Sequence, residues 1–241
     1  GRADLAVHSL KDVPMQLPEG FSLACVTVRE DSRDAFVSSR FASLEAMPEG
    51  SVVGTSSLRR ELMLKSRYPH LVVRSVRGNV GTRLSKLDAG QFDALIMAGA
   101  GLKRLGLSDR IRKWLPPEVS LPAPGQGALG IEIRSNDERL ARLVAFLNDE
   151  KTRAACTAER AVSRALGGSC QVPLAAYAVD RDGNLWLRAL VGDHRTGRVL
   201  FAQECAPYAQ AEELASRVVG QLLKQGAQKV LDAVLSETRN S

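Results

Sequence analysis

The stretch Ser51-Val-Val-Gly-Thr-Ser-Ser-Leu-Arg-Arg60 decides the fold class, because an apolar strand runs directly into hydroxyl residues that can cap the start of a helix. Strand-like runs recur on both sides of it, and helical patterns lie between several of them. The runs that predict strands cover residues 4–10, 22–28, 34–37, 51–53, 71–73, 92–97 and 128–133. Strands that alternate with helices predict an α/β architecture.

The stretch Leu115–Gly125 holds four of the ten prolines, and it predicts an extended crossing near a domain junction. The elements expected after it are helices at 137–147 and 150–166, alternating strands at 174–179 and 185–191, and helical patterns over 209–235. The pair Gly167-Gly168 is typical of a helix end. The sequence therefore predicts a further small α/β unit, built on a hairpin, that starts near Asp149.

The composition of the 241 residues is that of a globular protein, with 44% hydrophobic and 25% charged residues. No run approaches the roughly 18 apolar residues of a membrane-spanning helix, and no signal segment opens the chain, so we expect a cytoplasmic protein that contacts no membrane. The four cysteines include no C-x-x-C pair, and the three histidines lie far apart in sequence. These spacings argue against a disulfide scaffold and against a metal site.

The net charge of +6 is concentrated in residues 55–83. This window holds seven basic residues and one acidic residue, so the rest of the chain is neutral. Its one aromatic residue is Tyr68, and it therefore lacks the stacking surfaces of single-strand nucleic-acid binders. We expect a small polycarboxylate or phosphate as the anionic partner, and no nucleic acid.

Two expected strand-to-helix junctions carry arginines, at Gly54–Arg60 and at Ser75–Arg83. Ordinary helix capping explains their hydroxyl residues, but Arg59 and Arg60 in the first turn of a helix oppose the helix dipole. An anionic ligand at the free N–H groups would compensate for that cost. The glycines of the second junction let backbone amides approach such a ligand.

Three further motifs have both a functional and a structural interpretation. Val7–Pro14 brings Lys11 and Asp12 to the end of a buried-looking strand, either as ligand contacts or as a surface ion pair. Gly125–Gly130 matches the spacing G-x-G-x-x-G but leads into a strand, which argues against a dinucleotide site. Cys170 follows a helix end on a glycine-rich turn, either as an exposed thiol or as an inert apolar residue.

Five motifs occur in a definite order and spacing, namely His8-Ser-Leu-Lys-Asp-Val-Pro14, Gly54-Thr-Ser-Ser-Leu-Arg-Arg60, Arg77-Gly-Asn-Val-Gly-Thr-Arg83, Pro124-Gly-Gln-Gly-Ala128 and Gly168-Ser-Cys-Gln-Val-Pro173. Together they resemble the porphobilinogen deaminase family. The resemblance extends from residue 1 into the strand Trp186–Val191, and the number of separate motifs leaves little room for coincidence.

The resemblance implies an α/β fold of three domains, of which the first two are arranged like type II periplasmic binding proteins around a cleft. The third is a small α/β domain with an antiparallel sheet, which carries the cofactor. The boundaries that we expect are residues 1–30 with 127–148, residues 31–126, and residues 149–241. Family chains continue upstream of Gly1, so we expect an incomplete first domain, a strand at 4–10 that lacks neighbours, and weak or no activity of this fragment alone.

The resemblance also implies a transferase, hydroxymethylbilane synthase, which condenses four porphobilinogens head to tail with loss of ammonia in heme and porphyrin (tetrapyrrole) biosynthesis. Asp12 matches the family's catalytic aspartate, and Cys170 matches the cysteine that holds a dipyrromethane cofactor through a thioether. The positions that match cofactor or substrate contacts are Ser9, Lys11, Thr55, Ser56, Ser57, Arg59, Arg60, Arg77, Arg83 and Gln126. The family implies a monomer and no metal.

The alternative is a non-catalytic, anion-binding module of the periplasmic-binding-protein type. Arginine pairs suit either protein, because planar guanidinium groups bind carboxylates bidentately. Cys170 separates the two hypotheses, because a simple binder has no use for an exposed thiol in a third domain.

Overall fold

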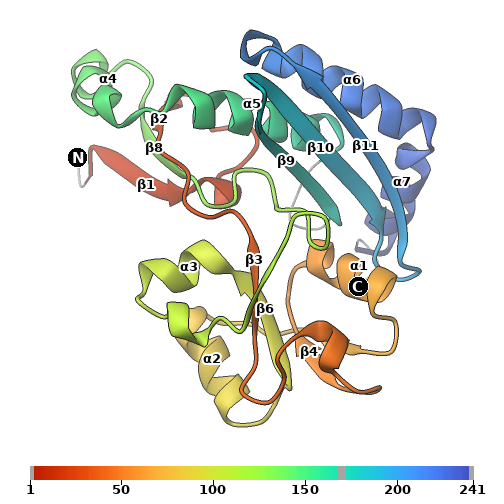
Figure 1. Cartoon of the computed structure of the whole chain (residues 1–241). Coiled ribbons are helices and arrows are strands. Elements are labelled where there is room, and N and C mark those ends of the chain that lie inside the picture. The colour runs from red at the N-terminus through yellow and green to blue at the C-terminus, as the bar shows by residue number, and fades with distance from the viewer. Residues whose placement is uncertain (1–2, 168–171, 239–241) are drawn as a thin grey trace.

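The polypeptide folds around three β-sheets, which are arranged in Figure 1 at the left, the bottom and the right. The computed structural model describes residues 3–167 and 172–238. The first sheet is antiparallel, with the strand order β1-β8-β2, and consists of Leu5–Ser9 (β1), Leu129–Arg134 (β8) and Phe21–Val26 (β2). A single 3-10 turn, Leu10–Asp12, follows β1 directly, and α4 (Glu138–Val144) packs on this sheet.

The second sheet has five strands in the order β5-β4-β6-β3-β7. They are Asp34–Val37 (β3), Val52–Gly54 (β4), Val72–Arg74 (β5), Ala94–Ala98 (β6) and Lys113–Leu115 (β7). Strand β4 is parallel to β5 and β6, whereas β3 is antiparallel to β6 and β7. Because successive side chains of a strand point to opposite faces, Phe36 and Val37 enter different cores. The helices of these cores are α1 (Leu58–Arg67) on one face, and α2 (Val80–Asp88) and α3 (Gly99–Arg104) on the other.

The third sheet is an antiparallel meander of β9 (Leu174–Arg181), β10 (Asn184–Asp193) and β11 (Arg198–Ala206). One face is buried by α5 (Glu150–Ala165), α6 (Ala211–Lys224) and α7 (Ala227–Thr238), and Leu187 and Ala189 of β10 belong to this core. Helix α1 lies on the other face of this sheet, where residues of α1, β10 and β11 line a common cavity. Trp186, Arg188 and Leu190 alternate with the core residues and therefore face the side of α1.

Two extended segments, residues 27–33 and 116–128, connect the first two sheets and lie side by side. The Glu30 N–H donates to the Gly127 carbonyl oxygen at 3.1 Å, and Arg29 Nε donates to the Gln126 carbonyl oxygen at 2.8 Å. Gly127 has a φ of +90°, and a Cβ atom there would lie 2.5 Å from the Glu30 oxygen. Only glycine fits this approach. The glycine at this position of the G-x-G-x-x-G motif thus serves chain packing.

The α/β architecture and the small unit with an antiparallel sheet are as the sequence predicted. The expectation that the strand at 4–10 lacks neighbours was wrong, because β1 pairs with β8 from Leu5 to Ser9. This strand is also not buried, since the exposed fractions of Leu5 and Val7 are 37% and 56%. Strands β7 and β11 were not expected. The helical patterns expected over 209–235 correspond to α6 and α7, which are separated at Gly226, whose φ is +95°. None of the described helices combines the length and the apolar character that crossing a membrane requires.

Candidate active site

A cavity of about 510 Å³ lies where the three sheets meet. The predicted site residues that line it are Lys11, Asp12, Ser56, Ser57, Arg59, Arg60, Arg83 and Gln126. They come from the 3-10 turn after β1, the start of α1, helix α2 and the returning segment 116–128. The third unit forms another side of the cavity, with Ser163 of α5, Val172 and Leu174. The described lining thus combines four cationic side chains with one carboxylate.

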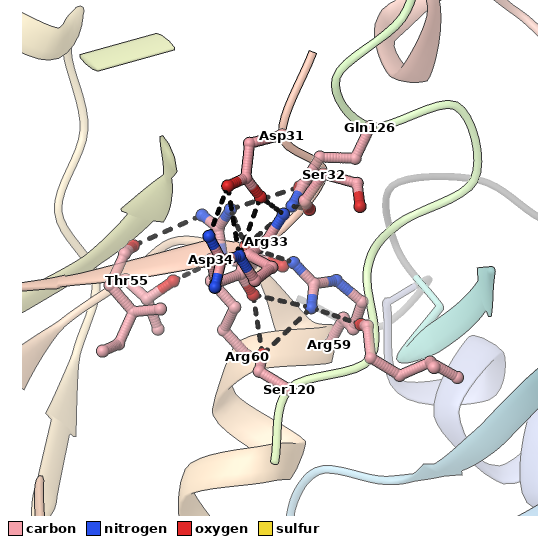
Figure 2. Close-up of polar contacts among 12 residues, drawn as sticks. Asp31, Ser32, Arg33, Asp34, Thr55, Arg59, Arg60, Ser120 and Gln126 are labelled. Carbon is pink, nitrogen blue, oxygen red and sulfur yellow. Dashed lines mark hydrogen bonds and ion pairs between the residues drawn. The ribbon is translucent and has the colours of Figure 1, made fainter. Parts of the chain in front are cut away.

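The carboxylate of Asp34 holds the two arginines of α1 (Figure 2). Asp34 begins β3 and is fully buried, and Arg59 and Arg60 are each only 6% exposed. Arg59 Nη1 lies 2.8 Å from Asp34 Oδ2, and Arg60 Nη2 lies 2.8 Å from Asp34 Oδ1. Burial alone raises the pKa of Asp34, but the two guanidinium charges outweigh burial and hold this pKa well below its usual value. The carboxylate is therefore ionised.

Two side chains of the returning segment complete this cluster. Ser120 Oγ donates to Asp34 Oδ2 at 2.7 Å, and Gln126 Nε2 donates to Asp34 Oδ1 at 2.9 Å (Figure 2). Arg59 Nη1 also donates to the Leu121 carbonyl oxygen at 2.6 Å. The arginine pair is therefore fixed between the second sheet and the segment that leads back to the first sheet.

The first turn of α1 corrects part of the sequence-based interpretation. Arg59 and Arg60 do lie in that turn, but Asp34 of the same chain, rather than a ligand alone, compensates for their charge. Ser57 occupies the N-cap position without a capping hydrogen bond from its side chain, and its N–H donates to Thr55 Oγ1 at 3.2 Å. The expected capping by hydroxyl groups is therefore wrong for this helix.

Lys11 and Asp12 both line the cavity without forming the ion pair that one interpretation expected. Neither side chain makes a hydrogen bond or an ion pair with any residue that the structure describes. Burial and the charge of Arg60 lower the pKa of Lys11 from 10.5 to about 8, although Asp12 acts in the opposite direction. Asp12 is exposed and belongs to the 3-10 turn that follows β1. Both groups are thus available to a ligand.

The second arginine-bearing junction, residues 75–83, contributes only Arg83 to the described lining of the cavity. Asn79 caps α2 by accepting a hydrogen bond from the Thr82 N–H at 2.9 Å, and Arg83 Nε donates to the Gly78 carbonyl oxygen at 2.8 Å. Burial and the nearby charge of Arg60 lower the pKa of Arg83. Arg77 is exposed and does not line the cavity.

Three other predicted site residues lie elsewhere or outside the described chain. Ser9 ends β1, Thr55 is buried beside the start of α1, and neither lines the cavity. Cys170 lies outside the described residues. Sequence reasoning missed Asp34, although an acidic residue that opens an entirely buried strand is an unusual signal.

Glu159 of α5 joins the third unit to both connecting segments, and sequence reasoning missed it too. Its carboxylate is fully buried and accepts hydrogen bonds from Arg29 Nη1 and Nη2 at 2.6 and 3.1 Å. It also accepts hydrogen bonds from the Gly125 N–H at 2.7 Å and from the Ala178 N–H at 2.8 Å. One side chain therefore ties residues of both segments to the third sheet.

The fold and the cavity together define an α/β protein with a cationic cavity where its three sheets meet. The profile of the family described as "Porphobilinogen deaminase, dipyromethane cofactor binding domain" matches residues 1–142, and that of "Porphobilinogen deaminase, C-terminal domain" matches residues 153–224. The chain belongs to the porphobilinogen deaminase family.

Curated relatives are similar along almost the whole chain. The porphobilinogen deaminase of Paraburkholderia phymatum is 60% identical over 237 residues, which cover 97% of this chain and 72% of the relative. That of Thiobacillus denitrificans is 58% identical and covers 97% of this chain and 76% of the relative. That of Neisseria meningitidis is 57% identical, with 98% and 76% covered.

Solved structures similar to part of the chain include substrate-binding proteins. One is a periplasmic substrate-binding protein of an ABC transporter from Coxiella burnetii, with a TM-score of 0.39, 15% identity, and 58% of this chain and 67% of that chain covered. Another is an arginine-specific periplasmic binding protein of Salmonella typhimurium, with a TM-score of 0.33, 12% identity, and 55% and 58% covered.

Proposed function

We propose that this chain catalyses the reaction of its family, the condensation of four porphobilinogens into the linear tetrapyrrole hydroxymethylbilane. It is a transferase of heme and porphyrin biosynthesis, and each condensation releases ammonia. The observation that carries the proposal is a cavity that combines Asp12 with four cationic side chains, in a chain 60% identical to a porphobilinogen deaminase. A non-catalytic anion-binding module is not favoured. Such a module has no use for an exposed carboxylate in its cavity, and the similar curated proteins are porphobilinogen deaminases.

The cavity fits the dipyrromethane cofactor of the family by its charge. Each pyrrole of such a group bears carboxylate side chains, and Lys11, Arg59, Arg60 and Arg83 supply cationic donors around one cavity. Asp34 neutralises part of the arginine pair, so these guanidinium groups stay ordered before a ligand arrives. When bound, the cofactor supplies the pyrrole end to which new units are added.

Cys170 is the attachment site that we propose for this cofactor. Cys25 and Cys156 are buried, and burial raises the pKa of Cys25 and that of Cys156, the latter to about 12, so both are poor nucleophiles. Cys205 is exposed on β11 and does not line the cavity. Val172 follows Cys170 by two residues in the chain and does line the cavity.

Asp12 is the catalytic residue in this proposal. Positive charge develops on the substrate carbon from which ammonia departs, and a carboxylate near it stabilises that charge. The Asp12 carboxylate also accepts a hydrogen bond from the pyrrole N–H. Arg83 and Lys11 pair with the carboxylates of the pyrroles and set their position, while Ser56 and Ser57 offer neutral hydrogen-bonding groups. Gln126 lines the cavity and acts through its hydrogen bond to Asp34. Ser9, Thr55 and Arg77 enter the proposal as contacts of longer pyrrole chains.

The remaining features of the proposal concern the whole protein. The enzyme is a cytoplasmic monomer that binds neither nucleic acid nor membranes. The domain division that we propose is residues 1–30 with 127–148, residues 31–126, and residues 149–241. The separate hydrophobic cores of the second and third sheets support this division.

The intact mass of the protein tests the proposal. The protein is expressed from its complete coding sequence in a host that makes tetrapyrroles, beside the variants Cys170→Ala and Cys205→Ala. We expect an excess of two linked pyrrole units in the parent and in Cys205→Ala, but not in Cys170→Ala. An unmodified parent, or an excess that survives in Cys170→Ala, would contradict the attachment site, and a loaded enzyme that releases no ammonia from porphobilinogen would contradict the activity.

The pH dependence of substrate affinity follows from Lys11. Because the pKa of Lys11 is lowered to about 8, its amino group is protonated and charged below pH 8, and it loses this charge as the pH rises through that value. We expect KM for porphobilinogen to rise about tenfold or more above pH 8, because a charge-assisted hydrogen bond to a carboxylate disappears. Steady-state kinetics from pH 7 to about pH 9.5 measure this rise of KM.

The variant Lys11→Met identifies the group that titrates. It should show the high KM at all these pH values, whereas Lys229→Met, which changes an exposed lysine outside the cavity, should keep the parental profile. If the rise of KM near pH 8 persisted in Lys11→Met, another group would be responsible for it.

A further inference from the structure

A second cavity, of about 650 Å³, lies between α1 and the face of the third sheet that the helices leave uncovered. Side chains of β10 and β11 form one wall, and α1 forms the opposite wall. Residues 117–121 of the returning segment close one side. The volume is within the range of about 300–1,000 Å³ that is typical of small-molecule sites. Nothing in the reaction proposed above uses this cavity.

The walls of the second cavity are mainly apolar. Leu62 and Met63 face it from α1, and Leu190, Val199 and Phe201 face it from the sheet. Val199 and Phe201 remain 38% and 43% exposed, so the apolar surface can be reached from solvent. An aromatic or aliphatic solute would remove this surface from water.

The charged groups of the same cavity are three guanidinium groups and one carboxylate. Arg188 lies 4.1 Å from the ring centroid of Trp186 and forms an ion pair with Glu118 at 2.6 Å. Arg67 donates to the backbone carbonyl oxygen of Glu118 and makes no ion pair in the part of the chain that the structure describes. The buried Nε atoms of Arg59 and Arg188 also find no acceptor among the described residues. Positive charge therefore exceeds negative charge beside an apolar surface.

We propose that this second cavity binds a small organic anion with an aromatic body. The aromatic body lies against Trp186, Val199 and Phe201, and the anionic group pairs with Arg67 and Arg188. Charge complementarity selects an anion, because a cation would add to the surplus of guanidinium groups.

The second cavity is connected to the first through Arg59, which lines both. The wall of the second cavity also contains Leu121, whose carbonyl oxygen accepts a hydrogen bond from Arg59. Leu121 follows Ser120 in the chain, and Ser120 donates a hydrogen bond to Asp34. A ligand that displaces residues 117–121 must therefore change the position of Arg59. Occupation of one cavity alters the affinity of the other, and this coupling is reciprocal.

Binding of anilinonaphthalene sulfonate, a fluorescent aromatic anion, tests the site directly and needs no turnover. We expect saturable binding, and quenching of protein fluorescence that is reduced in Trp186→Phe, in which Trp114 still emits. Phe201→Ser should weaken binding about tenfold or more. Phe146→Ser removes a phenyl ring that is 82% exposed and outside the cavity, and it should leave binding unchanged. Arg67→Gln should weaken binding and reduce its dependence on salt.

Equal loss in Phe201→Ser and Phe146→Ser, or no loss in Phe201→Ser, would overturn the site. The coupling rests on the proposed function and has its own readout. We expect the dye to slow porphobilinogen turnover in the parent and in Phe146→Ser, but not in Phe201→Ser, whose basal activity should be normal. Saturable binding without any effect on turnover would overturn the coupling and retain the site, whereas inactivity of every sample without dye would contradict the proposed function alone.

Discussion

Replacing Asp12 by Asn is expected to lower kcat about a hundredfold to a thousandfold, because an amide cannot stabilise the positive charge that develops as ammonia leaves. The fold should be unaffected, since the Asp12 side chain is exposed and makes no hydrogen bond or ion pair with any described residue. Cofactor loading should therefore remain, and intact mass measures it in the same sample. Steady-state release of ammonia from porphobilinogen measures kcat.

Two further variants control the Asp12 experiment. Asp12→Glu keeps the charge and should retain more activity than Asp12→Asn, with a loss set by the displaced carboxylate. Asp109→Asn removes an exposed carboxylate outside the cavity and should leave kcat unchanged. The assignment of Asp12 would be wrong if Asp12→Asn retained normal kcat, or if its loss of activity matched a loss of bound cofactor.

Replacing Asp34 by Asn is expected to lower the free energy of unfolding by about 3–5 kcal/mol, because two buried guanidinium groups lose their shared counter-charge. Acid should act in the same direction. The pKa of Asp34 is lowered by folding, so its carboxylate stabilises the folded state above the unfolded pKa of about 4, and this contribution declines as the pH falls below that value. Urea denaturation at several pH values measures both effects.

An exposed ion pair provides the matched control for Asp34. Asp88 pairs with Arg110 at 2.6 Å, but the Asp88 side chain is 52% exposed. Asp88→Asn should cost at most about 1 kcal/mol, because solvent screens such pairs. If Asp34→Asn were no less stable than Asp88→Asn, the arginine pair would not depend on the buried carboxylate.

The candidate site shows what local sequence can predict and what it cannot. Residues 54–60 predict a helix start with two arginines in its first turn, because capping and dipole effects act within one turn. The partner of those arginines could not be predicted. Asp34 precedes Arg59 by 25 residues, and only the strand order, which places β6 between β3 and β4, brings the start of β3 to the start of α1.

The two missed strands have different physical causes. Strand β7 has three residues and, unlike the equally short β4 and β5, it does not begin with two adjacent valines, which favour a strand. Strand β11 has buried residues at Leu200 and Ala202, but Val199 and Phe201 on its other face are also apolar. The alternation of apolar and polar residues that marks a half-buried strand is weak in β11, because Val199 and Phe201 line the second cavity.

The pairing of β1 and β2 with β8 has a consequence for the order in which the chain can fold. All five strands of the second sheet lie between Asp34 and Leu115, so this sheet can form as soon as that stretch has left the ribosome. Strands β1 and β2 leave before this stretch, yet their common neighbour β8 follows about a hundred residues later, and domains form from what has already been synthesised. The first sheet, whose strands β1 and β2 precede the second sheet in the chain, is therefore completed after the second sheet and before the third.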